Sequence, residues 1–428
     1  MKTRSYAHHF SENNIPFGIA SSARHAAPRP VTRLGNTVFF LENLAKNGFF
    51  NDITGLPHEA LQQPTLNQFA ALPRSVLRSV RRKVQDEFKM NGLASVPDEA
   101  KEDIEEVTMH LPVSIGDFSD FSCSLEHVKN AGRIIINDER PPPGFFNFPI
   151  GYQGRASSIV VSGTDIERPL GQFRNPDTKT ADAEPIIYGP SRKMDYELEL
   201  AAIIGRPLPM RQRLRATRAD DHIFGFALLN DWSSRDIQGF EMTPLGPFNG
   251  KSLGTTMSPW IVTLDALEPF RVTGPAQKLP LPAYLEDPAR ATYAIRMQVE
   301  IDAGGNTTVL GSSRVQSLYW SMRQMVAHAV SSGSALRTGD VLATGTVSGP
   351  EEGALGCLLE VTKGGVAPVR LDGGGERAFL EDGDVVRLTA TAGDEASGVG
   401  FGECTGRIVA SRPFEEGEKH ACPECGRP

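Results

Sequence analysis

The sequence predicts a mainly β, or α+β, fold in which a small N-terminal region precedes a larger β-rich region with few helices. After Pro112, runs of β-branched residues alternate with turns rich in glycine and proline, a pattern typical of strands. In this part, only residues 318–330 show clear helical periodicity. The charged stretch 97–103 is predicted to be an exposed connection close to the domain boundary. We therefore expect an N-terminal domain of residues 1–112 and a C-terminal domain of residues 113–428, with a tail after about residue 415.

Individual elements follow from local patterns. Residues 36–41 are predicted to form a strand, and residues 75–88 a basic amphipathic helix, because Val76, Val80 and Val84 recur at helical spacing. Glycines 373–375 predict a hairpin turn. Strands are predicted in the β-rich region at residues 134–136, 158–161, 257–264, 293–301 and 385–390.

The composition restricts the class of partner. The chain has 44 basic and 52 acidic residues, a net charge of −8, and no basic stripe, so we expect a small-molecule ligand and no nucleic acid or membrane partner. The first twenty residues are polar and charged, and no apolar run is long enough to span a bilayer, so no signal peptide or membrane anchor is expected. Five cysteines in 428 residues indicate a reducing, cytoplasmic setting. The pair Cys422 and Cys425 predicts a disordered or weakly metal-binding tail, because no second pair lies near it.

A set of acidic residues is the main functional signal. Strand alternation places Glu197 and Glu199 on one face, which Ala201 and Ile203 continue as an apolar surface. Two carboxylates on a partly dry face repel each other unless a cation neutralises them. The set therefore predicts a divalent cation site. The alternative is the solvated side of an edge strand, which is the commoner origin of this pattern.

A second polar cluster, residues 230–238, follows an apolar run and is predicted to be a strand end entering a helix. On a helix, Asp231, Arg235 and Gln238 would share one face. Alternatively, these residues only stabilise the helix, with Asp231 capping its N-terminus and forming an ion pair with Arg235.

Two short motifs are weaker signals. Residues 250–254 match the G-x-S-x-G elbow of serine hydrolases, but loop-forming residues precede them where the elbow needs a strand. A serine hydrolase using Ser252 is therefore an alternative with little support. Residues 400–406 lack the setting of a dinucleotide-binding loop, and glycines at a strand crossing explain them.

Several long blocks together resemble one known family. They are residues 114–121 (SIGDFSDF), 151–158 (GYQGRASS), 230–238 (NDWSSRDIQ), 244–248 (PLGPF) and 254–260 (GTTMSPW). In this order, and over most of the chain, they resemble the fumarylacetoacetase family, whose members cleave a carbon–carbon bond in a 1,3-diketo acid. The resemblance implies a small N-terminal SH3-like β domain, a C-terminal mixed β-roll, a homodimer, and a role in the catabolism of tyrosine and phenylalanine.

The resemblance also assigns roles to residues. It implies Mg²⁺ or Ca²⁺, or both, as the cofactor and His127 as the catalytic base, with Glu360, in a segment that would form an apolar strand, orienting the histidine. Tyr152, Gln238 and Thr346 match substrate contacts. The metal-site positions are Asp120, Glu197, Glu199 and Asp231, with Lys251 and Thr255 close to the ion.

Three positions depart from the pattern of the family. Ser122 and Met242 stand where the family has tyrosines, and Ile136 stands where it has an arginine. Isoleucine cannot bind a carboxylate as a guanidinium does, so the pocket is expected to prefer a bulkier or more apolar group.

The predicted function is metal-assisted hydrolysis of a diketo acid, fumarylacetoacetate or a related substrate. Water deprotonated by His127 would attack a carbonyl polarised by the cation, and Arg235, Gln238 and Lys251 would stabilise the enolate that leaves. One alternative is a related enzyme on the same scaffold that decarboxylates, tautomerises or forms a carbon–carbon bond in a β-keto acid. Another is a non-catalytic binding protein.

Overall fold

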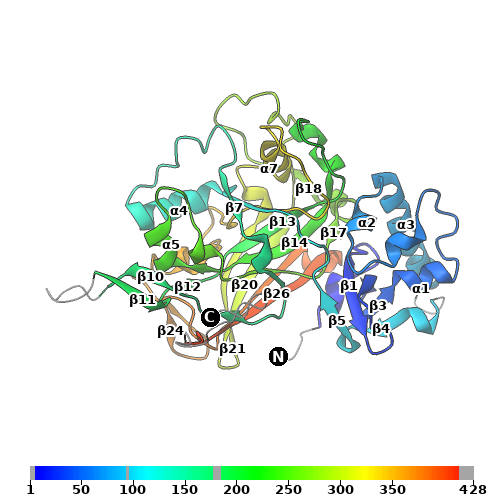
Figure 1. The fold of residues 1–428 in the computed structure, drawn as a ribbon, viewed down its shortest axis with the longest axis horizontal. Coiled ribbons are helices and arrows are strands. Elements are labelled where there is room, and N and C mark those ends of the chain that lie inside the picture. Colours follow the sequence, from blue (N-terminus) through cyan, green and yellow to red (C-terminus); the bar gives the residue numbers. More distant parts are fainter. Residues whose placement is uncertain (1–4, 93–95, 177–184, 414–428) are drawn as a thin grey trace, which may run out of the picture.

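The computed structural model describes residues 5–92, 96–176 and 185–413. These residues form a smaller N-terminal lobe, on the right in Figure 1, and a larger lobe that contains most of the strands. The predictions about the C-terminal tail, including Cys422 and Cys425, concern residues outside the described ones.

The N-terminal lobe has an antiparallel sheet of five strands in the order β4-β3-β2-β1-β5. Its strands are β1 (Phe17–Ser22), β2 (Arg29–Leu34), β3 (Thr37–Phe40), β4 (Lys101–Asp103) and β5 (Val107–His110). The predicted strand at 36–41 is confirmed as β3, although Leu41 already begins a helix. The prediction that residues 97–103 are only a connection is wrong, because β4 pairs with β3 and completes the sheet.

The helices of this lobe are α1 (Leu41–Lys46), α2 (Asn67–Ala70) and α3 (Arg74–Asn91). The predicted helix at 75–88 is confirmed as α3, whose Val76, Val80 and Val84 are buried. Helical periodicity therefore identified the correct apolar face.

The larger lobe is built on a mixed sheet with the strand order β7-β6-β22-β13-β14-β16-β8, and β17 pairs with β14 beside this path. These strands are β6 (Phe118–Phe121), β7 (Gly151–Gly154), β8 (Ile159–Val161), β13 (Leu198–Ile204), β14 (Ile223–Asp231), β16 (Thr255–Met257), β17 (Val262–Thr263) and β22 (Val341–Ala343). We call it the central sheet.

The second sheet of this lobe has the order β21-β20-β25-β26-β9. Its strands are β9 (Ile166–Glu167), β20 (Ile295–Ala303), β21 (Asn306–Arg314), β25 (Val385–Ala392) and β26 (Gly400–Val409). Short two-stranded pairs surround the sheets: β10 (Leu170–Arg174) with β11 (Ile186–Pro190), β12 (Met194–Asp195) with β15 (Ser233–Ser234), β18 (Arg271–Thr273) with β19 (Ala291–Tyr293), and β23 (Val369–Arg370) with β24 (Glu376–Arg377). The hairpin turn predicted at 373–375 is confirmed by the last pair.

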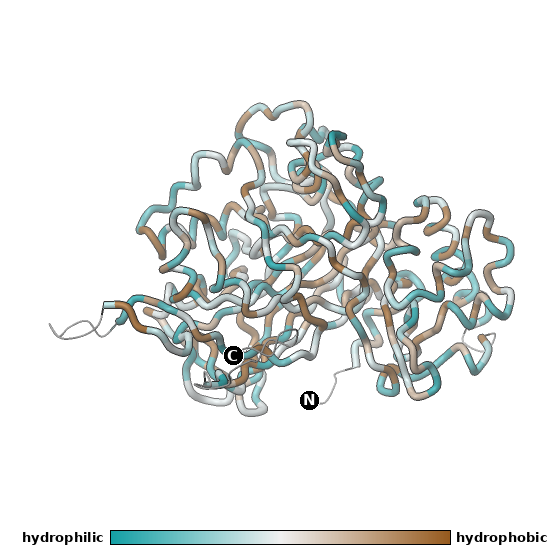
Figure 2. Tube along the Cα trace, in the orientation of Figure 1, coloured by the Kyte–Doolittle hydropathy of each residue, from teal (hydrophilic) through white to brown (hydrophobic). Residues whose placement is uncertain are grey.

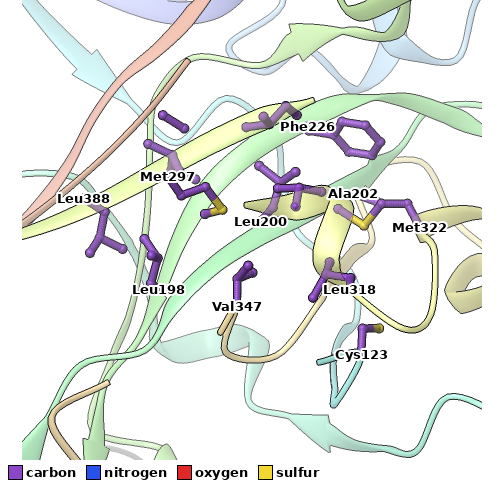
Figure 3. Packing of buried hydrophobic residues seen from close by; sticks show 14 of the residues in the cluster. Cys123, Leu198, Leu200, Ala202, Phe226, Met297, Leu318, Met322, Val347 and Leu388 are labelled. Carbon is purple, nitrogen blue, oxygen red and sulfur yellow. The ribbon is translucent and has the colours of Figure 1, made fainter. Parts of the chain in front are cut away.

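The two faces of β13 pack in different cores. Leu198, Leu200 and Ala202 belong to the core shared with the second sheet, and Figure 3 shows them near Met297 and Leu388. The opposite face packs with residues of the N-terminal lobe. Figure 2 accordingly shows hydrophobic stretches along the strands inside the molecule and hydrophilic ones along many outer loops. The predicted class, mainly β or α+β, is confirmed.

Three element predictions in this lobe need correction. Residues 134–136 form the end of a helix, because a capped helix starts at Ser124 and continues through them. The helix predicted at 318–330 covers Met322–Ala329 and starts at a capping box on Ser321. The stretch 257–264 is interrupted between β16 and β17. The helices are α4 (Leu125–Ile136), α5 (Arg235–Glu241), α6 (Leu264–Leu267), α7 (Met322–Ala329) and α8 (Leu358–Val361).

Candidate active site

Three strands of the central sheet bring the predicted acids together: β13 and β14, which are neighbours, and β6, which β22 separates from β13. On one face, each strand changes from apolar to acidic along its length: Phe118 to Asp120 on β6, Ala201 to Glu199 on β13, and Leu229 to Asp231 on β14. Glu197 directly precedes β13 and continues the same alternation. Ligand oxygens of Asp120, Glu197, Glu199 and Asp231 lie within 4.8 Å of one another. We call these four residues the carboxylate cluster.

The carboxylate cluster is buried, so the solvated-edge interpretation is wrong. Asp120 and Glu197 are 4% and 5% exposed, and Glu199 and Asp231 are fully buried. Burial and the neighbouring carboxylates raise the pKa of Asp120 and of Glu199 well above their ordinary values. Burial also raises the pKa of Asp231, although Lys251 opposes this shift.

Unpaired oxygen atoms show which group the carboxylate cluster fits. Oδ1 of Asp120 and both Oε atoms of Glu199 are buried and have no hydrogen-bond partner among the described residues. Buried charged oxygens normally have a partner, and hard divalent cations such as Mg²⁺ and Ca²⁺ take oxygen ligands. The donor set therefore fits a hard divalent cation.

Lys251 and Thr255 contact the carboxylate cluster, as predicted. The ammonium of Lys251 pairs with Glu197 and lies 2.6 Å from Oδ2 of Asp231. Thr255 Oγ1 donates to Oδ1 of Asp231 at 2.9 Å. Arg235 also pairs with Glu197, so two cationic side chains neutralise part of the charge of the four carboxylates. In the described part of the chain, neither Asp120 nor Glu199 forms an ion pair, which leaves negative charge for a bound cation to balance.

Helix α5 supplies Arg235 and Gln238, but it does not include Asp231. Asp231 ends β14, so the prediction that these three residues share a helical face is wrong, and Asp231 is neither the cap of α5 nor the partner of Arg235. Arg235 Nη1 lies 2.8 Å from Oε1 of Glu197 and donates to Gln238 Oε1 at 3.1 Å. Its Nη2 is buried, and no group in the described part of the chain forms a hydrogen bond with it.

His127 and Glu360 form the predicted pair. His127 lies in the first turn of α4, and its Nδ1 is 2.8 Å from Oε2 of Glu360. Burial alone would raise the pKa of Glu360, but His127 and the hydrogen bonds lower it to about 2. Ser348 Oγ, Asn130 Nδ2 and the Cys357 thiol also donate to this carboxylate, at 2.7, 2.9 and 3.2 Å. A fixed carboxylate on Nδ1 sets the tautomer of the imidazole and leaves Nε2 free to accept a proton.

Glu360 lies in the short helix α8, so its expected place in a strand is wrong. His127, Cys357 and Glu360 are also close enough to hold a metal. Unlike Glu199, however, Oε2 of Glu360 already accepts three hydrogen bonds. The hydrogen bonds of Glu360 therefore indicate an acid/base pair, whereas the unpaired oxygens of Glu199 indicate a cation site.

Comparisons with known proteins show the family of the chain. A family model described as "Fumarylacetoacetate (FAA) hydrolase C-terminal" matches residues 117–409, and one described as "Fumarylacetoacetase N-terminal" matches residues 13–112. The chain belongs to the fumarylacetoacetase family. It is 41% identical to a fumarylacetoacetase of Arabidopsis thaliana, covering 95% of this chain and 97% of the relative. A fumarylacetoacetase of Homo sapiens is 38% identical, covering 94% and 96%.

A solved structure, a fumarylacetoacetate hydrolase from Exiguobacterium antarcticum, has a similar fold, with a TM-score of 0.52 and 19% sequence identity. The match covers 92% of this chain and 99% of that chain. This likeness supports the fold alone. None of the helices in the described part of the chain is both long and apolar enough to cross a membrane.

The candidate site opens into a cleft of about 780 Å³. Asp120 and Glu197 of the carboxylate cluster line it, together with His127 and Lys251. Every other predicted substrate contact lines it as well: Tyr152, Gln238, Thr346, Ser122, Ile136 and Met242. Tyr152 donates to Oδ2 of Asp231 at 3.0 Å, and the buried Oγ1 of Thr346 has no protein partner.

The mouth of the cleft is apolar at the positions that depart from the family. Ile136 and Met242 are 70% and 42% exposed, and Ile135 beside them is 54% exposed. Arg140 also lines the cleft, but it forms a close ion pair with Asp138. At position 136 the mouth therefore has an isoleucine in place of the arginine of the family. The side chains that a ligand would contact there are apolar.

Two residues that support the site, Asp195 and Glu241, were not predicted from the sequence. Asp195 accepts hydrogen bonds from α8 and from Arg235, and its spacing continues the alternation of Glu197 and Glu199, a signal that could have identified it. Glu241 accepts backbone N–H groups of Phe248, Asn249 and Gly250 at 2.7, 3.0 and 2.8 Å, which fixes the loop that carries Lys251.

Ser252 does not have the setting of a nucleophile. It follows a short 3-10 helix, a strand rather than a helix comes after it, and its Oγ donates to the carbonyl of Phe248 at 2.6 Å. Ser252→Ala is therefore expected to keep kcat within about twofold of the unsubstituted enzyme, and the protein should resist serine-directed phosphonates. Steady-state kinetics before and after phosphonate treatment measure both. Loss of more than 100-fold in either experiment would restore the serine hydrolase alternative.

Proposed function

We propose that this member of the family hydrolyses a carbon–carbon bond of a 1,3-diketo acid, fumarylacetoacetate or a related compound, with a divalent cation as cofactor. The main support is one cleft lined by Asp120 and Glu197 of the carboxylate cluster and by His127, which Glu360 orients. Behind this lining, Glu199 and Asp231 complete the cluster. The likeness to curated fumarylacetoacetases over most of the chain supports the reaction class.

The carboxylates of Asp120, Glu197, Glu199 and Asp231 would hold Mg²⁺ or Ca²⁺ in this proposal. A cation bound there supplies Lewis acidity, orienting the oxygens of a diketo acid and polarising its carbonyl. Positioned oxygen ligands and an accessible cleft are consistent with that task.

The residues of the chain carry the proton transfers. His127 Nε2 accepts a proton from water as the water attacks the carbonyl carbon, and Glu360 stabilises the imidazolium that forms. The carbon–carbon bond then breaks, and its electron pair leaves as an enolate that is protonated to the ketone. Lys251 and the free Nη2 of Arg235, with Gln238 beside it, place positive charge and donors where the enolate oxygen develops.

The direct test is product analysis. The purified protein with Mg²⁺ or Ca²⁺ is mixed with fumarylacetoacetate and with acylpyruvates that carry alkyl or aryl acyl groups. Loss of enol absorbance together with one carboxylic acid product for each bond cleaved supports hydrolysis. Loss of CO₂, an isomer of unchanged mass, or no reaction with every compound contradicts it and favours the related β-keto acid enzymes of the same scaffold or a binding protein.

The apolar mouth gives a prediction about specificity. The double substitution Ile136→Arg and Met242→Tyr is expected to raise kcat/KM for fumarylacetoacetate at least 10-fold and to lower it for alkyl acylpyruvates. Arginine can bind the distal carboxylate with two hydrogen bonds, which isoleucine cannot do. Met90→Arg, on the exposed surface of α3, controls for added charge. If the unsubstituted enzyme already prefers fumarylacetoacetate, or if the double variant does not change the preference, these positions do not select the substrate.

Assembly and location are also part of the proposal. We expect a homodimer, which light scattering of the purified protein can measure. The three described cysteines, Cys123, Cys357 and Cys404, are buried free thiols, which supports a reducing compartment such as the cytoplasm.

A further inference from the structure

Asp195 is a buried carboxylate that connects the two halves of the site without lining the cleft. It ends strand β12 and is fully buried. Its two oxygens accept four hydrogen bonds, from the backbone N–H groups of Tyr196, Leu358 and Leu359 and from the side chain of Arg235. An ionised carboxylate of this kind is costly to bury unless every oxygen has a partner, which is the case here.

One pair of these bonds fixes the helix that carries Glu360. Leu358 N and Leu359 N donate to Oδ1 and Oδ2 of Asp195 at 2.7 and 3.0 Å. They are the first two residues of α8, and Cys357, the N-cap residue before them, makes no side-chain capping bond. Because α8 has only four residues, from Leu358 to Val361, a cap from another part of the chain governs its position.

The remaining bond holds Arg235. Its Nε donates to Oδ2 of Asp195 at 2.8 Å, while its Nη1 lies 2.8 Å from Oε1 of Glu197. Asp195 and Glu197 thus bind the guanidinium from two sides and fix the orientation of Nη2, which has no hydrogen-bond partner among the described residues. The same Oδ2 accepts from Leu359 N, so one oxygen links α8 to Arg235.

We propose that Asp195 is a positioning residue that sets the place of the general base, through Glu360, relative to the oxyanion donor Arg235. Attack by water and departure of the enolate need these two groups at fixed positions around one substrate. Asp195 contacts both α8, which carries Glu360, and Arg235, and therefore couples their positions. It contacts neither the substrate nor His127. This inference rests on the proposed hydrolysis.

The test is Asp195→Asn, which keeps the size of the side chain but removes its charge and replaces one acceptor by a donor. We expect kcat to fall about 10–100-fold, as for other partners that orient catalytic groups. The cation concentration that gives half-maximal activity should change less than about threefold, because the hydrogen bonds of Asp195 reach the carboxylate cluster at Glu197 alone, and there only through Arg235. Combined with Glu360→Gln, the loss should be smaller than the product of the two single losses, because the substitutions share one effect.

Asp384→Asn is the matched control. Asp384 is buried like Asp195, binds Arg377 with both oxygens at 2.8 and 3.0 Å and accepts the backbone N–H of Glu381, but it lies outside the cleft lining. We expect it to lower the melting temperature while kcat stays within twofold. A similar melting change with unchanged kcat in Asp195→Asn, or single losses that multiply in full, would overturn the inference.

Should Asp195→Asn not fold, a second pair of variants answers the question. Asp195→Asn with Arg235→Gln removes both buried charges, which is milder than leaving one unpaired. The pair should be slower than Arg235→Gln alone, because α8 still loses an acceptor; equal kcat values overturn the inference. An unsubstituted enzyme that hydrolyses no diketo acid would instead refute the proposed function.

Discussion

His127→Asn is expected to lower kcat by about 10²–10⁴-fold while the protein stays folded and still binds its cation. Asparagine can hydrogen-bond to Glu360 but cannot accept the proton of water near neutral pH, and positioned general bases contribute rate factors of this size. His127 contacts Glu360 and does not belong to the carboxylate cluster, so cation affinity should change little. Single-turnover kinetics at saturating cation and substrate measure the chemical step.

His328→Asn is the matched control. His328 is also partly buried and hydrogen-bonded, with its Nδ1 2.9 Å from the hydroxyl of Tyr284, but it lies outside the cleft lining. It should keep kcat within about threefold. If His127→Asn also keeps kcat within about threefold, His127 is not the general base. If His127→Asn abolishes cation binding, the role of His127 is structural.

Glu199→Gln is expected to abolish cation-dependent activity and yet to stabilise the cation-free protein. Both oxygens of Glu199 are buried without a partner, and burial with Asp120, Glu197 and Asp231 nearby raises its pKa well above the usual value. A neutral amide removes that repulsion but is a poorer ligand for a hard cation. In the unsubstituted protein, cation at 100 times its Kd should add about 2.7 kcal/mol of stability, and in Glu199→Gln the gain should largely vanish. Thermal melts with chelator and with added Mg²⁺ or Ca²⁺ measure both.

The dependence on pH has a defined sign. A carboxyl whose pKa is raised by folding binds more protons in the folded state, so its contribution to stability falls as pH rises above its unfolded pKa of about 4.3. Without cation, the advantage of Glu199→Gln over the unsubstituted protein should therefore grow with pH from about 4.3 towards neutrality.

Glu102→Gln is the control for this pair of experiments, because Glu102 is a buried glutamate of the N-terminal sheet that hydrogen-bonds to Ser22. It should leave the cation-induced change in melting temperature intact. If Glu199→Gln instead destabilises the cation-free protein and keeps the full cation effect, Glu199 is not a ligand.

Local sequence patterns identified the features that depend on alternation. The two-residue period placed Glu197 and Glu199 on the face of Ala201 and Ile203, and β13 has that arrangement. On β14, alternation would also have placed Asp231 on the face of Leu229, but the prediction put Asp231 on a helix and was wrong. Alternation predicts faces well because each strand is buried on both sides and cannot shift by one residue without exposing a core.

Two helices were not predicted, one with local capping signals and one set by a distant contact. Three consecutive isoleucines at 134–136 favour a strand locally, yet the helix capped by Ser124 continues through them to Asn137, which takes the left-handed conformation at its end. Helix α8 is stabilised by Asp195, which is 163 residues away from Leu358. No local window contains both partners, so neither the helix nor the role of Asp195 could be derived from periodicity.

The central claim is that the carboxylate cluster binds a divalent cation beside His127. Anomalous diffraction from crystals grown with Mn²⁺, a substitute for Mg²⁺ that scatters anomalously, tests it most directly. We expect one strong peak per chain, about 2.0–2.6 Å from oxygens of Asp120, Glu199 and Asp231, which disappears in Glu199→Gln crystals. A crystal saturated with Mn²⁺ that shows no peak among these oxygens, or one that persists unchanged in the variant, would contradict the account.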